Sequence, residues 1–277
     1  MVAGINRVQL GTPANFFDLV KLEILAQYGH VVEIDRKSLH KFGRNTNVGT
    51  SEVEINALNQ NEIYLGSNGI THASSSSAGD TQEIYYEGMT RVGNIYTFVS
   101  DTFNLTGQSS IALPTPVSVC TRALDNDGTD LLGNCYFHEG GATTGGIPDD
   151  LTEAHNLILA GDNQSLRAGT SIASNNYGIL CNAWAFVNKK TTASADIKFK
   201  VRPLGGVFRT QAVGSLTTSG GGFQLNFEPY AIIPPNSDVY ITAQASTTGV
   251  DVSAGFMMFF ADIKNNAALM SKTREWL

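Results

Sequence analysis

The residues that could bind a metal ion or support catalysis form no known functional pattern in this sequence. Carboxylate and amide oxygens, the ligands that Ca²⁺ prefers, are concentrated in the phrase Asp125-Asn126-Asp127-Gly128-Thr129-Asp130. An EF-hand loop has Gly at its sixth position and Glu at its twelfth, whereas Gly128 is fourth here and Tyr136 is twelfth. The β-rich flanks therefore favour a hairpin turn over a calcium site.

The histidines and acidic residues likewise indicate no enzyme. His138 and Glu139 could join a metal site or form a general base, but no partner lies at a useful spacing along the chain. The sequence has neither the G-x-S-x-G elbow of many hydrolases nor the G-x-x-x-x-G-K-[ST] loop that binds nucleotide phosphates. Asp149 and Asp150 are adjacent carboxylates in a Gly-rich segment, where water screens them. We expect no catalytic residue, no metal ion and no cofactor.

The cysteines, at positions 120, 135 and 181, leave two interpretations open. Cys120 and Cys135 could face each other across a hairpin and pair, since a turn signal lies between them. Reduced thiols buried in strands are favoured, because Cys behaves as a small apolar side chain. Zinc is not expected, because the sequence has no C-x-x-C pair.

The composition argues against two classes of partner. Charged residues make up only 16% of the 277 residues and the formal net charge is -7, whereas nucleic-acid-binding proteins place Lys and Arg on phosphates. No apolar run reaches the ~18 residues of a membrane-spanning helix. Residues 1–10 lack the pattern of a secretory signal. We expect no nucleic-acid partner and no membrane partner.

One short helix is predicted at the start of an otherwise all-β chain. Pro13 opens an amphipathic segment over 13–28, and Gly29 follows as a stop signal. The apolar face of this segment includes Phe16, Phe17, Val20 and Leu22.

Beyond residue 31 the apolar residues alternate with a period of two, which is typical of half-buried strands. The clearest example is Ile197 and Phe199, which alternate with Lys198 and Lys200. The 28 glycines, with many Ser, Thr and Asn, suit the tight turns between short strands. Strands are expected near 81–86, 94–100, 111–119, 131–137, 154–160, 166–172, 178–187, 194–201, 205–213, 222–228, 238–245 and 253–262.

A Gly-rich stretch near 139–152 divides these strands into two predicted β-sandwich (jelly-roll-like) domains. Trp184 falls inside the apolar strand 178–187 and is expected in the core, so a sugar-binding role for it rests on analogy alone. The predicted organisation is an N-terminal helical arm over 1–34, a β domain over 35–152, a β-sandwich domain over 153–264 and a C-terminal tail over 265–277.

Several phrases, in their order along the chain, resemble a group of virion proteins from tailed bacteriophages, notably short-tailed marine and cyanobacterial phages. They are KFGRN (41–45) followed by VGT (48–50), a hairpin over 81–113 with LTGQ (105–108), AGDNQSL (160–166), VRPLGGVFR (201–209) and VDVSAGF (250–256). The resemblance covers about 41–262 and does not extend to the helical segment.

The resemblance implies a structural protein of the phage head, and capsid decoration or cement is the role that it favours. Such a protein binds the outer surface of the assembled capsid and stabilises it by mass action. Its partners would be the major capsid protein and further copies of itself, in a closed homo-oligomer for which a trimer is favoured. The resemblance provides no catalytic residues to transfer.

Two segments are candidates for the capsid contact. The apolar face of 13–28 would by itself expose a hydrophobic stripe, which usually marks a contact surface. A basic cluster over 36–44 could contact an acidic surface, although an ordinary solvated segment is the simpler interpretation. The basic candidates are Arg36, Lys37, Lys41 and Arg44. Deleting residues 1–45 is expected to abolish capsid binding and to leave the β domains folded.

Two other functions stay open. A tail fibre, adaptor or receptor-binding module would contact glycan on the host surface and would be present in few copies per particle. A glycan hydrolase would need two carboxylates about 5–10 Å apart in a cleft, and the sequence singles out no such pair.

Overall fold

The computed structural model describes residues 34–60, 67–188, 193–217 and 222–266, and their regular structure is almost entirely β-strand. The exception in these ranges is the 3-10 helix η1 (Leu151–Glu153), which Asp150 caps by accepting from the Thr152 N–H at 2.9 Å. The predicted all-β class is confirmed. The helix predicted over 13–28, and the tail beyond residue 266, lie outside the described residues.

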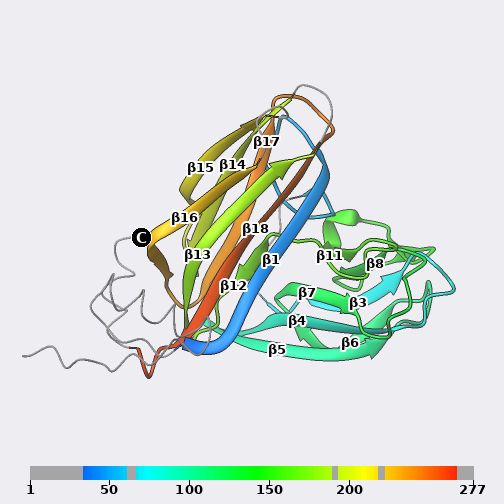
Figure 1. The fold of residues 1–277 in the computed structure, drawn as a ribbon. Coiled ribbons are helices and arrows are strands. Elements are labelled where there is room, and N and C mark those ends of the chain that lie inside the picture. Colours follow the sequence, from blue (N-terminus) through cyan, green and yellow to red (C-terminus); the bar gives the residue numbers. More distant parts are fainter. Residues whose placement is uncertain (1–33, 61–66, 189–192, 218–221, 267–277) are drawn as a thin grey trace, which may run out of the picture.

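Two antiparallel sheets face each other in what we call the main lobe (Figure 1). One sheet has the order β1-β18-β13-β16, and the other has the order β12-β17-β14-β15 with β2 paired to β17. The strands of the first sheet are β1 (Ile34–Val48), β13 (Asn176–Val187), β16 (Phe223–Ile233) and β18 (Val250–Asp262). Those of the second are β2 (Val53–Glu54), β12 (Gly169–Ser171), β14 (Ser194–Pro203), β15 (Arg209–Thr217) and β17 (Ser237–Ala245).

Strand β14 shows how the sequence pattern produces this sandwich. Ile197 and Phe199 are buried, and the Phe199 ring lies edge-on to Phe256 of the opposite sheet, with ring centroids 5.8 Å apart. Lys198 points the other way and forms an ion pair with Glu52 at 2.7 Å. The predicted alternation is confirmed, because one face of the strand packs on the core and the other meets solvent.

The chain between β2 and β12 forms a second sandwich, which we call the insert lobe (70–158). Its sheets have the orders β11-β8-β3-β6 and β5-β4-β7. A separate core lies between them, in which the rings of Tyr86, Phe103 and Phe137 lie 5.8, 5.9 and 6.0 Å apart. The strands are β3 (Ile70–Ser75), β4 (Glu83–Val92), β5 (Ile95–Asn104), β6 (Ile111–Val117), β7 (Val119–Asp125), β8 (Cys135–His138) and β11 (Ala154–Ile158), with a small hairpin of β9 (Thr143–Thr144) and β10 (Ile147–Pro148).

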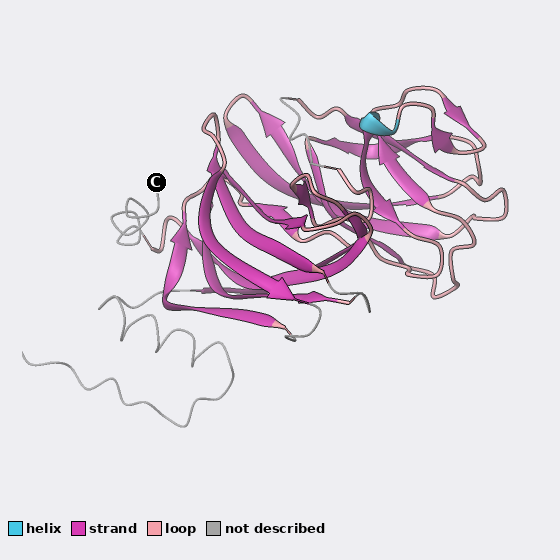
Figure 2. Ribbon diagram, turned by 90° about the horizontal axis from the view of Figure 1, so that it is seen from above, coloured by secondary structure: helices cyan, strands magenta, loops and turns pink. Residues whose placement is uncertain are grey.

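The two sandwiches do not follow one another along the chain, which corrects the predicted domain boundaries at 35 and 153. Strands β1 and β2 pair with β18 and β17, so the first described strands complete the main lobe. Strand β11 pairs with β8 in the insert lobe. In Figure 1 the blue strand β1 lies beside β18, and Figure 2 shows the two lobes side by side. Local periodicity detects a strand but does not show which distant strand it pairs with.

Strand β16 extends beyond the strand predicted near 222–228, because it continues through Pro229 to Ile233. The pairing of β16 with β13 shifts register here: Leu180 pairs with Ala231, whereas Asn182 pairs with Asn226. Such an irregularity accommodates a proline, which has no N–H to donate to the neighbouring strand.

The Ser run 74–77 begins inside β3. Ser74 and Ser75 are buried. Their hydroxyls donate to the carbonyl of Gly146 at 2.9 Å and to the carboxylate of Asp80 at 2.6 Å. These bonds satisfy the polar groups away from water.

Candidate functional site

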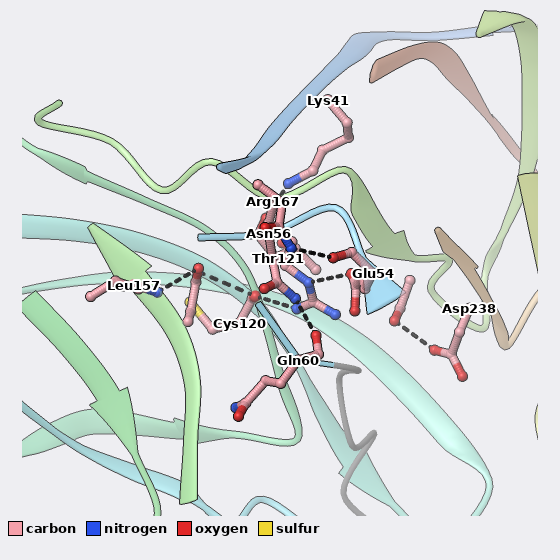
Figure 3. Close-up of polar contacts among 12 residues, drawn as sticks. Lys41, Glu54, Asn56, Gln60, Cys120, Thr121, Leu157, Arg167 and Asp238 are labelled. Carbon is pink, nitrogen blue, oxygen red and sulfur yellow. Dashed lines mark hydrogen bonds and ion pairs between the residues drawn. The ribbon is translucent and has the colours of Figure 1, made fainter. Parts of the chain in front are cut away.

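Arg167 and Glu54 form a buried ion pair where the lobes meet (Figure 3). Both side chains are 1% exposed, and Arg167 Nε donates to Glu54 Oε1 at 3.0 Å. Gly169 leaves room for this carboxylate, because a Cβ there would lie 2.5 Å from Oε1. Arg167 Nη1 also donates to the carbonyl of Cys120 on β7, at 2.8 Å. The arginine therefore joins the main lobe to the insert lobe through groups that have left water.

Lys41 reaches the same junction from β1 (Figure 3). Its side chain is buried, and its Nζ donates to the carbonyl of Thr121. Burial, and then the charge of Arg167, lowers the pKa of Lys41 to about 7. The prediction that Lys41 contacts a capsid is corrected, because the side chain ties β1 to β7 inside the protein.

The tip of the β4–β5 hairpin provides a further connection between the lobes. The Ser174 N–H donates to the carbonyl of Tyr96 at 2.9 Å, and the Tyr96 N–H donates to the Ser174 hydroxyl at 2.8 Å. Met89 and Val119 of the insert lobe pack with Ala173 of the main lobe in a small apolar cluster. The lobes are thus connected by two separate sets of contacts.

Arg44 is the one basic candidate whose described side chain remains on the surface. Its Nη2 and Nε donate to the two carboxylate oxygens of Asp251 at 2.7 and 3.1 Å, which joins β1 to β18. For Arg36 and Lys37 the structure describes only the backbone, which lies in β1. The apolar candidates Phe16, Phe17, Val20 and Leu22 lie outside the described residues.

Histidines that are far apart in the sequence lie together in the insert lobe. His72 on β3 and His138 on β8 are cross-strand partners, with ring centroids 6.0 Å apart. His155 on β11 has its Nε2 2.9 Å from the carboxylate of Glu139. This grouping could not be predicted from the spacing of the histidines along the chain, because it depends on the pairing of β8 with both β3 and β11.

The environment of His138 favours its neutral form. The Gly140 N–H donates to Nδ1 at 3.2 Å, so the ring proton resides on Nε2, which lies 3.2 Å from the Ser74 hydroxyl. Burial, and then the charges of His72 and His155, lowers the pKa of His138 to about 4. Protonation of Nδ1 would also break the bond from Gly140.

Over the ranges that the structure describes, no three His, Cys, Asp or Glu side chains gather so as to hold a metal ion. The acidic phrase 125–130 connects β7 to β8, which lie in different sheets, so the predicted hairpin turn is corrected. Cys120, Cys135 and Cys181 are buried reduced thiols, which confirms the favoured interpretation. None of the described helical structure is long and apolar enough to span a membrane.

Large apolar side chains are exposed on the β4–β5 hairpin. Val92 and Ile95 are cross-strand partners next to its turn and are 74% and 57% exposed, and Phe98 on β5 is 43% exposed. Within the described part of the chain, β5 pairs with β4 alone and forms the edge of its sheet. An edge strand with apolar side chains is a surface to which another protein can add a strand.

A second exposed group lies on the outer face of the β1-β18-β13-β16 sheet. The rings of Phe42 and Trp184 have centroids 5.5 Å apart and planes 29° apart, and the Phe186 ring lies 5.7 Å from Trp184. Phe42 and Phe186 are 41% and 45% exposed, and Trp184 is half-buried. We call these three side chains the aromatic face.

The prediction that Trp184 belongs to the core is wrong. Ala183 and Ala185 are buried between the sheets, so Trp184 points outward from β13. Both faces of this strand carry apolar residues, and a period of two cannot then show which set is inside.

No protein family model matches the sequence, and no curated protein matches it. Among solved structures, the chain is similar to the crystal structure of the infectious bursal disease virus VP2 subviral particle, at 11% identity. The match covers 87% of this chain and 75% of that chain, with a TM-score of 0.25. A TM-score this low supports no argument about function. The class that the structure itself defines is an all-β protein of two sandwiches.

Replacing Arg167 with Met should lower the free energy of unfolding by about 3–5 kcal/mol, because the Glu54 carboxylate stays buried without its cation. Urea denaturation measures this change. The matched control is Arg44→Met, which removes an exposed ion pair and should cost less than ~1 kcal/mol. A loss no larger than that of the control would contradict the role given to Arg167.

Stability should also fall on mild acidification because of His138. Its folded pKa of about 4 lies below the ordinary value of 6.5, so below pH 6.5 the unfolded chain binds the proton first. The stabilisation from neutral His138 is complete above pH 6.5 and is lost as the pH falls toward 4. The loss in the free energy of unfolding reaches about 2 kcal/mol by pH 5. Urea unfolding at pH 7, 6 and 5 measures the loss. The His138→Gln variant should lose much less stability between pH 7 and pH 5. A loss equal to that of the unchanged protein would show that other groups cause the pH dependence.

Proposed function

We propose that the protein is a structural protein of a phage virion that binds the outside of the assembled head as a decoration or cement protein, and that it is not an enzyme. The observation that carries the proposal is the exposed apolar hairpin β4–β5 with its edge strand. Beyond Tyr96, whose backbone groups are bonded to Ser174, such a surface suits a protein partner, because it offers backbone hydrogen-bonding groups together with side chains that gain from leaving water. The connected lobes would present this hairpin to the partner in a fixed orientation.

The sequence phrases that resemble phage virion proteins contain or adjoin residues that connect the strands and lobes. The phrases over 41–45 and 250–256 lie on the paired strands β1 and β18, where Arg44 contacts Asp251. The phrase over 160–166 leads directly into Arg167. Arg202, in the phrase over 201–209, forms an ion pair with the buried Asp238 at 2.7 Å. In this chain, these phrases therefore contain or adjoin residues that hold the strands and lobes together.

The proposed partners are the major capsid protein and further copies of the chain. Closed symmetric oligomers are the usual state of such assemblies, and a trimer would fit a threefold position of a capsid. The N-terminal segment 13–28 is retained as a second proposed contact.

The deletion of residues 1–45 that was expected to leave the β domains folded is too long to test this segment. Removing residues 1–45 would take away most of β1, whose pairing with β18 runs from Ile34 to Val48. A deletion of 1–33 leaves that strand whole, so a change in head binding would not be confused with a loss of folding.

The double variant Val92→Ser and Ile95→Ser should bind heads that lack this protein at least ~10-fold more weakly, because both changes remove apolar contact area at the proposed interface. Co-sedimentation with purified heads measures the affinity. The matched control is Val207→Ser with Val213→Ser, which changes two valines that are 71% and 60% exposed on the main lobe. Equal binding by the two double variants would remove the hairpin from the interface.

Copy number separates decoration from the alternative of a tail fibre, adaptor or receptor-binding module. Mass spectrometry of purified particles should give about one copy per capsid subunit, or one trimer per few subunits, if the protein covers the head. A ratio of a few per cent would indicate the tail instead. Complete absence from particles would exclude both virion roles.

A further inference from the structure

The aromatic face is built so that ring surfaces lie along the sheet. The indole of Trp184 lies over Gly255 of β18, where a Cβ would overlap the ring. The Phe186 ring lies over Gly222 in the same way. Any larger residue at either glycine would lift the ring away from the sheet, so these two positions need glycine for close approach.

Polar side chains border the rings. On one side, Arg44 is held by both oxygens of Asp251, and Asn188 Nδ2 donates to the Ser253 hydroxyl at 2.8 Å. On the β16 side, Gln224 is the exposed cross-strand partner of Trp184. The surface is therefore an aromatic centre with oriented hydrogen-bonding groups at its border.

The charges of this surface point to an uncharged ligand. Asp251 balances the charge of Arg44 at a distance of 2.7 Å, so a ligand meets aromatic rings and side-chain amides rather than a field of one sign. A pyranose sugar matches these groups. Its C–H face can stack on the electron-rich face of an aromatic ring, while its hydroxyls can both donate and accept at the border.

We propose that the aromatic face is a carbohydrate-binding site whose ligand is a neutral oligosaccharide of pyranose units. The ligand stacks on Trp184 and on its neighbours Phe42 and Phe186, and hydrogen-bonds to the polar border. This site is made of main-lobe side chains, whereas Val92 and Ile95, which are proposed to contact the head, belong to the insert lobe. The proposal therefore goes beyond a structural role and can be tested separately from it.

Titration of the full chain with neutral hexasaccharides of glucose, galactose and N-acetylglucosamine tests the site, with tryptophan fluorescence as the signal. The sequence contains two tryptophans, so a Trp276→Phe background assigns the signal to Trp184. We expect a saturable change with at least one of the three sugars. No saturable change with any of them would overturn the proposal.

Two variants and a control locate the binding. Phe42→Ala and Phe186→Ala should each weaken the affinity at least ~10-fold, because each removes one stacking surface. Phe98→Ala removes an aromatic ring of similar exposure from the insert lobe and should leave the affinity unchanged. The urea midpoint of each variant verifies that it is folded.

The same variants distinguish a sugar site from a protein contact. Sugar binding that is lost while head binding is retained supports the proposal and leaves the role of the hairpin intact. Sugar binding that survives both ring removals would overturn it. Loss of head binding alone would instead make the aromatic face part of the protein interface.

Discussion

The arrangement of the two lobes depends on the charge of Arg167. A guanidinium that is almost completely buried must keep its hydrogen bonds, and its partners come from both sides of the junction: the Glu54 carboxylate from the main lobe and the Cys120 carbonyl from the insert lobe. The buried amine of Lys41 lies beside it and donates to the Thr121 carbonyl. Rotation of one lobe would leave these groups without partners and away from water, so the docked orientation is strongly favoured over its neighbours.

Other ionisable side chains of the main lobe also form hydrogen bonds and ion pairs that stabilise the fold. Glu52 accepts from Lys198, Lys200 and Thr242 on the outer face of the main lobe, and the lysine hydrogen bonds help to lower its pKa to about 2 against the effect of burial. Asp238 is completely buried and accepts from Ser171 as well as Arg202. These two carboxylates therefore connect neighbouring strands of the sandwich through their hydrogen bonds.

The sequence predicted the parts of the fold that depend on neighbours along the chain. The alternation in β14 identified a strand and its buried face, because Lys198 and Lys200 mark the solvent side unambiguously. Trp184 was misplaced because β13 has no such charged marker. The domain order and the grouping of His72 with His138 could not be foreseen, since both depend on which strands pair. Lys41 was misread for the same reason, as its acceptor, Thr121, is brought to it only by the docking of the lobes.

The insertion of one sandwich into the other has a consequence for how the protein forms during synthesis. Strand β1 finds its hydrogen-bonding partner only when β18 has been made, near the other end of the chain. The insert lobe, by contrast, draws its strands from one continuous stretch and can close first. The main lobe has a high contact order, so its completion is slow and waits until β18 has left the ribosome. Until then neither side of the strand that carries Phe42 and Arg44 is paired, and in the finished sheet β1 pairs, among the described strands, with β18 alone and remains the edge strand. An unpaired side of this kind is exposed to pairing with the same strand of another nascent chain.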